Sequence, residues 1–357
     1  MRKKNAQIIF ILITVLLNSC TESRVETEFT LNSFDKSFYL KDGQSYENDS
    51  LFLGNPRWIR FHPDSFLIIQ EMGSAKMLTV IDLKCNMIQK LISKGKGPGE
   101  MISVWGIEIL NKDLYAFCGQ LRKVIKLSPG KDRRFNIIDE FMLDEKQSKG
   151  TYPLTENLLV CLSNIGDVNR FTYLTGEGKI IRKFGDYPTL LNSDQVKPDN
   201  DIFGSYISAN SNGSKFVVVC AYTDIIEIYD TEKGLERRIH GPLGINLEAH
   251  YVKVGPGRMT RREPGYLTYC MADANIDEFW TGFISYKGEK NKGPRLTEAY
   301  PKQIFCFNWK GKPLRIINLE FPVFAFDVDW GNKILYCIKC DEESPGLISF
   351  SIKDILK

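Results

Sequence analysis

The sequence lacks the motifs on which several enzyme classes depend. Its 357 residues include only three histidines, and neither H-E-x-x-H nor G-x-S-x-G occurs. Zincin and nucleophile-elbow chemistry therefore have no support. The chain also lacks helical periodicity, because no amphipathic pattern after residue 20 lasts three turns. That absence favours an all-β chain.

The sequence also lacks an excess of charge of either sign. Lysine and arginine total 47 against 44 acidic residues, and Arg2, Lys3 and Lys4 account for the whole difference. These three residues lie in a segment that is expected to be removed, so the mature protein is neutral. A general nucleic-acid binder needs a basic excess, and we expect no nucleic-acid partner.

Long hydrophobic runs are absent except for one near the start, Ile8–Leu17, which follows a basic beginning. Ten residues span about 15 Å as a helix, half of a bilayer core, which indicates a signal peptide over residues 1–19. The run ends in Leu17-Asn18-Ser19-Cys20, which resembles a bacterial lipobox. We therefore expect lipidation at Cys20, a tether over residues 20–29, and attachment to the cell envelope at the outer membrane, on its periplasmic or surface side. The alternative is a plain secretory peptide with a chance cysteine.

Eight cysteines remain after Cys20, and their positions argue against a disulfide framework. Four of them come late in apolar, strand-like runs, for example Cys220 after Val217-Val218-Val219. Cys337 and Cys340 form a C-x-x-C, but no second pair and no nearby histidine accompany it, so no zinc site is expected. We interpret most of these cysteines as small buried hydrophobic residues.

The chain repeats one unit six times. Each unit contains a polar turn, an apolar strand, a second strand, a further turn and a third strand, and another short strand precedes most units. Four strands at this spacing are the signature of a propeller blade. The first strands of the six units begin near Phe66, Leu114, Leu158, Phe216, Phe279 and Ile334.

The sixth unit ends at Lys357 without an outer strand. The segment Phe29–Leu53 belongs to no unit and is able to supply that strand, which would close the ring and cover an exposed sheet edge. The sequence therefore predicts an all-β, six-bladed β-propeller over residues 30–357, with four-stranded blades and a ring closed by an N-terminal strand.

The first unit ends in Gly95-Lys96-Gly97-Pro98-Gly99-Glu100, after an outer strand and before the next inner strand. With the lipobox and the six units, this motif resembles the TolB-like six-bladed propeller lipoproteins of Bacteroidetes. The resemblance covers about residues 30–357. It implies an envelope lipoprotein that serves as a binding platform, and no catalytic residues are carried over from it. We interpret the glycine motif as a structural turn between blades, since Pro98 and a following strand oppose a phosphate cradle.

No metal and no cofactor are predicted. Asp199-Asn200-Asp201-Ile202-Phe203-Gly204 begins like a calcium loop, but Phe203 stands where an oxygen ligand belongs and Asn210 where a bidentate glutamate belongs. Some six-bladed propellers are calcium-dependent lactonases with acids in the central channel, and Glu108, Asp327 and Asp329 are the candidates here.

Three long connections, at about 185–204, 241–265 and 284–303, are expected on one face of the propeller. The second and third carry nine basic and four acidic residues, with tyrosines among them. Arginine and aromatic side chains together suit an acidic glycan, a carboxylate or the acidic patch of a partner. The predicted ligand-binding residues are Arg258, Arg261, Arg262, Arg295, His250 and Tyr251.

These observations favour a lipid-anchored propeller that acts as a noncatalytic binding or scaffolding module for a protein or an acidic ligand. One alternative is a metal-dependent hydrolase or lactonase with its site at the central channel. Another is a surface glycan-binding protein. The channel separates the first two hypotheses, because several acids around a cation would favour the enzyme and a plugged channel would favour the scaffold.

Overall fold

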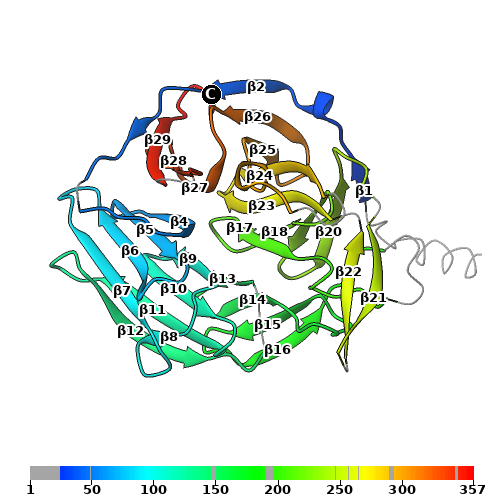
Figure 1. The fold of residues 1–357 in the computed structure, drawn as a ribbon, viewed down its shortest axis with the longest axis horizontal. Helices are drawn as coiled ribbons and strands as arrows, with labels where there is room; N and C mark the ends of the chain where they lie inside the picture. Colours follow the sequence, from blue (N-terminus) through cyan, green and yellow to red (C-terminus); the bar gives the residue numbers. More distant parts are fainter. Residues whose placement is uncertain are drawn as a thin grey trace, which may run out of the picture.

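The computed structural model describes residues 25–48, 50–145, 150–189, 196–245, 247–255, 257–263, 265–288, 293–341 and 345–357. These residues form strands and two short 3-10 turns, η1 (Leu31–Ser33) and η2 (Leu296–Glu298). Six sheets stand in a ring around one axis (Figure 1). The predicted all-β, six-bladed propeller is confirmed.

Each blade is a mainly antiparallel sheet whose first strand lies at the centre of the ring (Figure 1). Blade 1 contains β4 (Pro56–His62), β5 (Phe66–Glu71), β6 (Lys76–Asp82), β7 (Ile88–Lys94) and the short β8 (Glu100–Met101). Blade 2 contains β9 (Gly106–Leu110), β10 (Asp113–Cys118), β11 (Lys123–Pro129) and β12 (Phe135–Met142). Blade 3 contains β13 (Thr151–Thr155), β14 (Leu158–Leu162), β15 (Phe171–Thr175) and β16 (Ile180–Phe184).

The other three blades each gain a strand from the N-terminal segment. Blade 4 contains β17 (Ser205–Ala209), β18 (Lys215–Cys220), β19 (Ile225–Asp230) and β20 (Gly234–His240). Blade 5 contains β23 (Tyr266–Ala274), β24 (Glu278–Lys287), β25 (Gln303–Asn308) and β26 (Pro313–Leu319). Blade 6 contains β27 (Val323–Asp329), β28 (Ile334–Lys339) and β29 (Gly346–Ser351).

The N-terminal segment runs along the outer edges of three successive blades (Figure 1). β1 (Val25–Glu28) pairs in parallel with β20, and β2 (Lys36–Leu40) pairs in parallel with β26. β3 (Gln44–Ser45) pairs antiparallel with β29 and is the missing outer strand of blade 6. The closure prediction is confirmed, and the two additional edge strands were not foreseen.

The same segment shortens the expected tether. Residues 25–29 were assigned to a tether, but β1 already pairs with β20, and the Phe29 side chain is only 5% exposed. Phe29 and Phe34 pack against the rings of Phe305 and Phe307 in blade 5. Residues 1–19 and Cys20 lie outside the described residues, so the predicted signal peptide and lipidation site are not tested.

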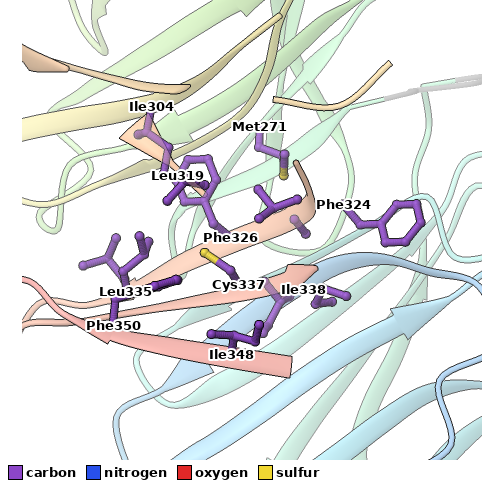
Figure 2. Packing of buried hydrophobic residues seen from close by; sticks show 14 of the residues in the cluster. Met271, Ile304, Leu319, Phe324, Phe326, Leu335, Cys337, Ile338, Ile348 and Phe350 are labelled. Carbon is purple, nitrogen blue, oxygen red and sulfur yellow. The ribbon is translucent and has the colours of Figure 1, made fainter. Parts of the chain in front are cut away.

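The blades pack face to face through apolar side chains, because the second strand of a blade is covered on both of its faces. In β5 every residue is buried, and in β18 the run Phe216–Cys220 is buried. Figure 2 shows this packing where Leu335 and Cys337 of blade 6 meet side chains of blade 5 such as Ile304 and Leu319. A contiguous apolar layer of this kind supplies most of the stability of a propeller.

The eight described cysteines are all unpaired, and seven of them are buried. They fill the apolar layer as small hydrophobic residues, as the sequence indicates. The exception is Cys85, which is exposed.

The glycine motif connects blade 1 to blade 2 as a structural turn. The Glu100 carboxylate folds back to accept a hydrogen bond from the Gly97 amide at 3.0 Å. A Cβ atom at Gly95 would meet the same carboxylate, so a larger residue there would displace the Glu100 side chain. The Gly99 amide donates to Glu140 of β12 at 2.6 Å, which fastens the turn to the neighbouring blade.

The connection between blades 4 and 5 was expected to be a loop and is instead a β-hairpin. Its strands are β21 (Glu248–Val254) and β22 (Gly257–Glu263), and they form a separate two-stranded sheet. The sequence concealed it because charged residues interrupt any run of apolar ones. The hairpin lies at the rim of the ring, beside blade 4 (Figure 1).

Candidate functional site

The six inner strands bring polar side chains together around the axis. A cavity of about 540 Å³ opens at the end of the channel where these strands end, and all six blades line it. We call this end the polar mouth. It is defined by one side chain from each inner strand: Arg60, Glu108, Tyr152, Ser208, Asp273 and Asp327.

Arg60 is the centre of the polar mouth. Its Nε and Nη2 atoms each donate to one Glu108 carboxylate oxygen at 2.8 Å, which is the bidentate geometry of a strong ion pair. Its Nη1 atom lies 3.4 Å from Asp327 Oδ1 and donates to the Ile59 carbonyl at 2.9 Å. All three charged side chains are buried, so each depends on the others for charge compensation.

Backbone amides hold the remaining carboxylate oxygens of the mouth. The Phe61 amide donates to Asp327 Oδ2 at 2.6 Å, and the Val328 amide donates to Asp273 Oδ2 at 2.9 Å. These bonds join neighbouring blades, since Asp327 belongs to β27 of blade 6 and Phe61 to β4 of blade 1. The acids of the polar mouth therefore also hold adjacent blades together.

Burial raises the pKa values of all three acids of the polar mouth. The pKa of Asp273 rises to about 7, with burial outweighing the opposing effect of Arg60 and of two backbone amides. The pKa values of Asp327 and Glu108 are also raised by burial, against the attraction of Arg60. Burial likewise raises the pKa of Tyr152, so its hydroxyl stays protonated across the physiological range.

Two acids singled out in the sequence have other roles. Asp329 accepts hydrogen bonds from the Asn332 amide at 2.9 Å and from its side-chain nitrogen at 2.7 Å, which stabilises the turn after β27. Asp199 accepts from the amides of Asp201 and Ile202 and holds its own loop in the same way. Within the described part of the chain, no three His, Cys, Asp or Glu side chains are grouped so that they could hold a metal ion.

The channel is closed in its middle by two aromatic side chains. Trp58 of blade 1 and Tyr206 of blade 4 come from opposite blades, and their ring centroids lie 5.5 Å apart with an edge-to-face tilt of 62°. A small cavity of about 70 Å³ lies beside them. The two ends of the channel are therefore separate cavities.

The second end, where the inner strands begin, has a different character. A cavity of about 330 Å³ opens there, and we call it the aromatic mouth. Among the described residues, Arg57 is the only charged residue that lines it. The other lining residues are Trp58, Met72, Tyr206, Ala221, Tyr222, Leu267, Tyr269, Cys270, Met271, Ile284, Ala299, Tyr300 and Phe324.

The hairpin separates the predicted site residues into two groups. Arg261 lies opposite His250 in the register, and Arg262 lies opposite Ala249. Successive residues of a strand point to opposite faces, so Arg261 and Arg262 do not line one cleft from the same face. Arg261 and His250 are exposed.

Arg262 and Tyr251 lie on the face that packs against blade 4. The Arg262 guanidinium stacks 3.6 Å from the centroid of the Tyr222 ring and donates to the Asp201 carbonyl oxygen. The Tyr251 hydroxyl accepts a hydrogen bond from the Lys197 amide at 3.3 Å. Since Tyr222 lines the aromatic mouth, Arg262 lies at the rim of that cavity.

The other two predicted arginines are placed less fully. The backbone of Arg258 pairs with Lys253 in the hairpin, and its side chain lies outside the described part of the structure. Arg295 is exposed, and its amide donates to the Glu298 carboxylate at 3.0 Å at the start of η2. Ligand binding by the predicted residues stays a prediction.

Sequence reasoning found Glu108 and Asp327 but missed Arg57, Arg60, Tyr152 and Asp273. A signal for two of these, Arg60 and Asp273, was present, because each is a polar residue that interrupts the apolar pattern near the end of its inner strand. Tyr152 was hidden because β13 contains Pro153 and was not recognised as a strand. No signal marked Arg57, whose importance lies in the absence of a partner.

Comparisons with known proteins agree with this architecture. The sequence model of a family described as TolB-like 6-blade propeller-like matches residues 33–330. A protein of Bacteroides fragilis that is described as exported has a similar structure, with 12% identity, a TM-score of 0.52, and coverage of 92% of this chain and 99% of that one. A duf4221 family member from Bacteroides vulgatus has 11% identity, a TM-score of 0.53, and coverage of 86% and 97%. At these identities the likeness shows the fold alone. No curated protein matches the chain.

Proposed function

The chain belongs to the TolB-like six-bladed propeller family, and from this premise we propose that it is a noncatalytic binding or scaffolding module of the cell envelope. Its ligand is a protein surface or an acidic molecule. The protein is exported and is held to the outer membrane by lipid at Cys20. Export is supported by the description of the Bacteroides fragilis protein with the same fold.

The observation that carries this proposal is the closed channel. Trp58 and Tyr206 meet across the axis, and Arg60 occupies the space between Glu108 and Asp327. The carboxylates that would hold a catalytic cation are already paired with a guanidinium and with backbone amides. A channel built in this way supports a rigid platform rather than a reaction centre.

An acidic partner is supported by exposed basic residues in two of the long connections. Lys253 and Arg261 are exposed on opposite faces of the hairpin, and Arg295 is exposed in the connection between β24 and β25. Exposed basic residues attract acidic surfaces and raise the rate of association.

Anchoring is supported by the sequence before β1. Only four residues separate Cys20 from Val25, and five residues of extended chain reach at most about 18 Å. A lipid on Cys20 would therefore hold the edge of blade 4 close to the membrane surface. Within the described residues, no helix is long and apolar enough to cross a membrane.

The anchor is tested by fractionation of cells that express Cys20→Ser. We expect the variant to leave the membrane fraction while keeping the melting temperature of the wild type. Its retention on membranes after low-detergent washes would contradict the anchor.

The binding function is tested by pull-down from envelope extracts with wild type and with Lys253→Glu/Arg261→Glu. We expect the charge reversal to remove captured partners that the wild type holds at low salt. The matched control is Lys353→Glu, which changes an exposed lysine outside the hairpin and is expected to have no effect. Equal capture by all three proteins would refute an acidic partner at the hairpin.

The competing function is a metal-dependent hydrolase at the central channel, and the pairing of Glu108 and Asp327 with Arg60 opposes it. Calorimetric titration with Ca²⁺ tests it directly. Tight binding that disappears in Asp273→Asn would favour the enzyme over the platform.

A further inference from the structure

We propose that the aromatic mouth is a binding site for a small organic carboxylate, with the acid group on Arg57 and an apolar body against the surrounding rings. This inference rests on the proposed binding function and adds a site and a ligand class to it.

The first argument is that Arg57 is an uncompensated cation. Its guanidinium lies 5.8 Å from the ring centroids of both Tyr300 and Phe324. Its Nε atom is buried and has no hydrogen-bond partner. Among the described residues, no carboxylate pairs with it. A buried donor without a partner is unfavourable unless another molecule satisfies it.

The second argument is that arginines elsewhere in the propeller do not share this condition. The three arginines that are fully buried each have a carboxylate within reach, in the pairs Arg60–Glu108, Arg170–Glu227 and Arg238–Glu227. Arg57 is half-buried, and among the described residues no carboxylate pairs with it.

The third argument is the shape and chemistry of the cavity. Its volume of about 330 Å³ is at the lower end of the range for small-molecule sites. Aromatic and aliphatic side chains form the wall, and no acid lines it. An apolar ligand body would replace water against Trp58, Tyr206 and Met271, while a carboxylate would complete the planar fork of Arg57.

Arg262 strengthens the selection for an anion. It lies against Tyr222 at the rim, so a second guanidinium adds positive potential to the entrance. A cationic ligand is disfavoured by both arginines, and a neutral ligand leaves Arg57 unpaired. A single negative charge on an apolar body matches the site on both counts.

The experiment is calorimetric titration of the full-length chain with 4-phenylbutyrate and octanoate, each compared with its neutral amide. We expect both acids to bind with one-to-one stoichiometry and each amide to bind at least tenfold more weakly. We expect Arg57→Gln to weaken binding of the acids at least tenfold and to leave the amides unaffected. Arg134→Gln, which changes an exposed arginine of blade 2, is the matched control and should bind as the wild type does.

Arg57→Lys keeps the charge without the fork, and we expect it to bind with intermediate affinity. If Arg57→Gln fails to fold, the comparison of acids with amides on the wild type still decides the matter. The proposal is overturned if acids and amides bind equally, if Arg57→Gln binds acids as the wild type does, or if neither acid binds.

The pull-down described above distinguishes a failure of this carboxylate site from a failure of the proposed binding function. A chain that captures its envelope partner but binds no carboxylate refutes the site alone. A chain that binds the acids while all pull-down variants behave alike keeps the site and refutes the acidic partner.

Discussion

The two mouths of the channel contain two arginines of the same strand, three residues apart, which differ in whether a carboxylate pairs with them. Arg60 is buried and paired with Glu108 and Asp327, whereas Arg57 lies between two aromatic rings without a carboxylate. One strand thus serves both ends of the channel, because its side chains at successive levels meet different neighbours. The buried charge of Arg60 is balanced by the fold, whereas Arg57 is half-buried and its buried Nε atom has no hydrogen-bond partner, which leaves it available to a ligand.

The largest effect that separates the mouths is expected from Arg60→Met. Removing the guanidinium leaves Glu108 and Asp327 buried without a cation, which should lower the free energy of unfolding by about 3–5 kcal/mol. Urea denaturation measures this loss. The double variant Arg60→Met/Glu108→Met should recover part of it, and a single variant as stable as the wild type would contradict the role given to Arg60.

A smaller loss is expected from Trp58→Ala, which removes one of the two rings between the mouths. The missing side chain should lower the free energy of unfolding by about 2–4 kcal/mol, because a cavity is created beside Tyr206. The separation of the two cavities would also be lost. Denaturation gives the stability, and a probe that enters only a continuous channel gives the opening. An unchanged midpoint would show that the Trp58–Tyr206 contact does not support the ring.

The pH dependence of stability should distinguish the polar mouth as well. Since the folded-state pKa of Asp273 is raised to about 7, its contribution to stability is complete at low pH and is lost as the pH rises from about 4 through 7. Asp273→Asn removes this loss. At pH 8 the variant should gain roughly 1–3 kcal/mol relative to wild type, and at pH 4 the two should agree.

Thermal or urea unfolding of wild type and Asp273→Asn from pH 4 to 8 tests the predicted direction of this stability change. A wild type that becomes more stable than Asp273→Asn as the pH rises would mean that Asp273 is stabilised as the anion.

The smallest effect is expected from Arg57→Met. This change keeps the contacts with Tyr300 and Phe324 and removes an unpaired charge, so the free energy of unfolding should stay within about 1 kcal/mol or rise slightly. A loss comparable to that of Arg60→Met would show that both arginines are structural and would remove the contrast between the mouths.

Much of the fold was predictable because strand periodicity and turn residues are local signals. The strand that the sequence places first in each unit is the second strand of a blade. In all six blades it begins within one residue of the expected position, for example at Phe66 and Leu158. The closure by an N-terminal strand was predictable from a count of strands. β1 and β2 were not, because edge pairing in parallel leaves no local mark in a polar segment.

The sites were less accessible to sequence reasoning. Whether an arginine is paired depends on residues that are far away in sequence, such as Arg60 and Asp327, which are 267 positions apart. The exposed basic residues of the hairpin were visible, but their division between two faces required its register. A charge balance is a property of the assembled ring, and a linear sequence does not display it.

The strands at the rim have a consequence for the order of events in folding. Residues 36–45 leave the ribosome early, yet their partners lie in residues 313–351, at the end of the chain. During synthesis, this segment must wait unpaired until most of the polypeptide has followed it. This early segment is therefore among the last to pair, and a chain interrupted before β26 leaves both β2 and β3 without their partner strands.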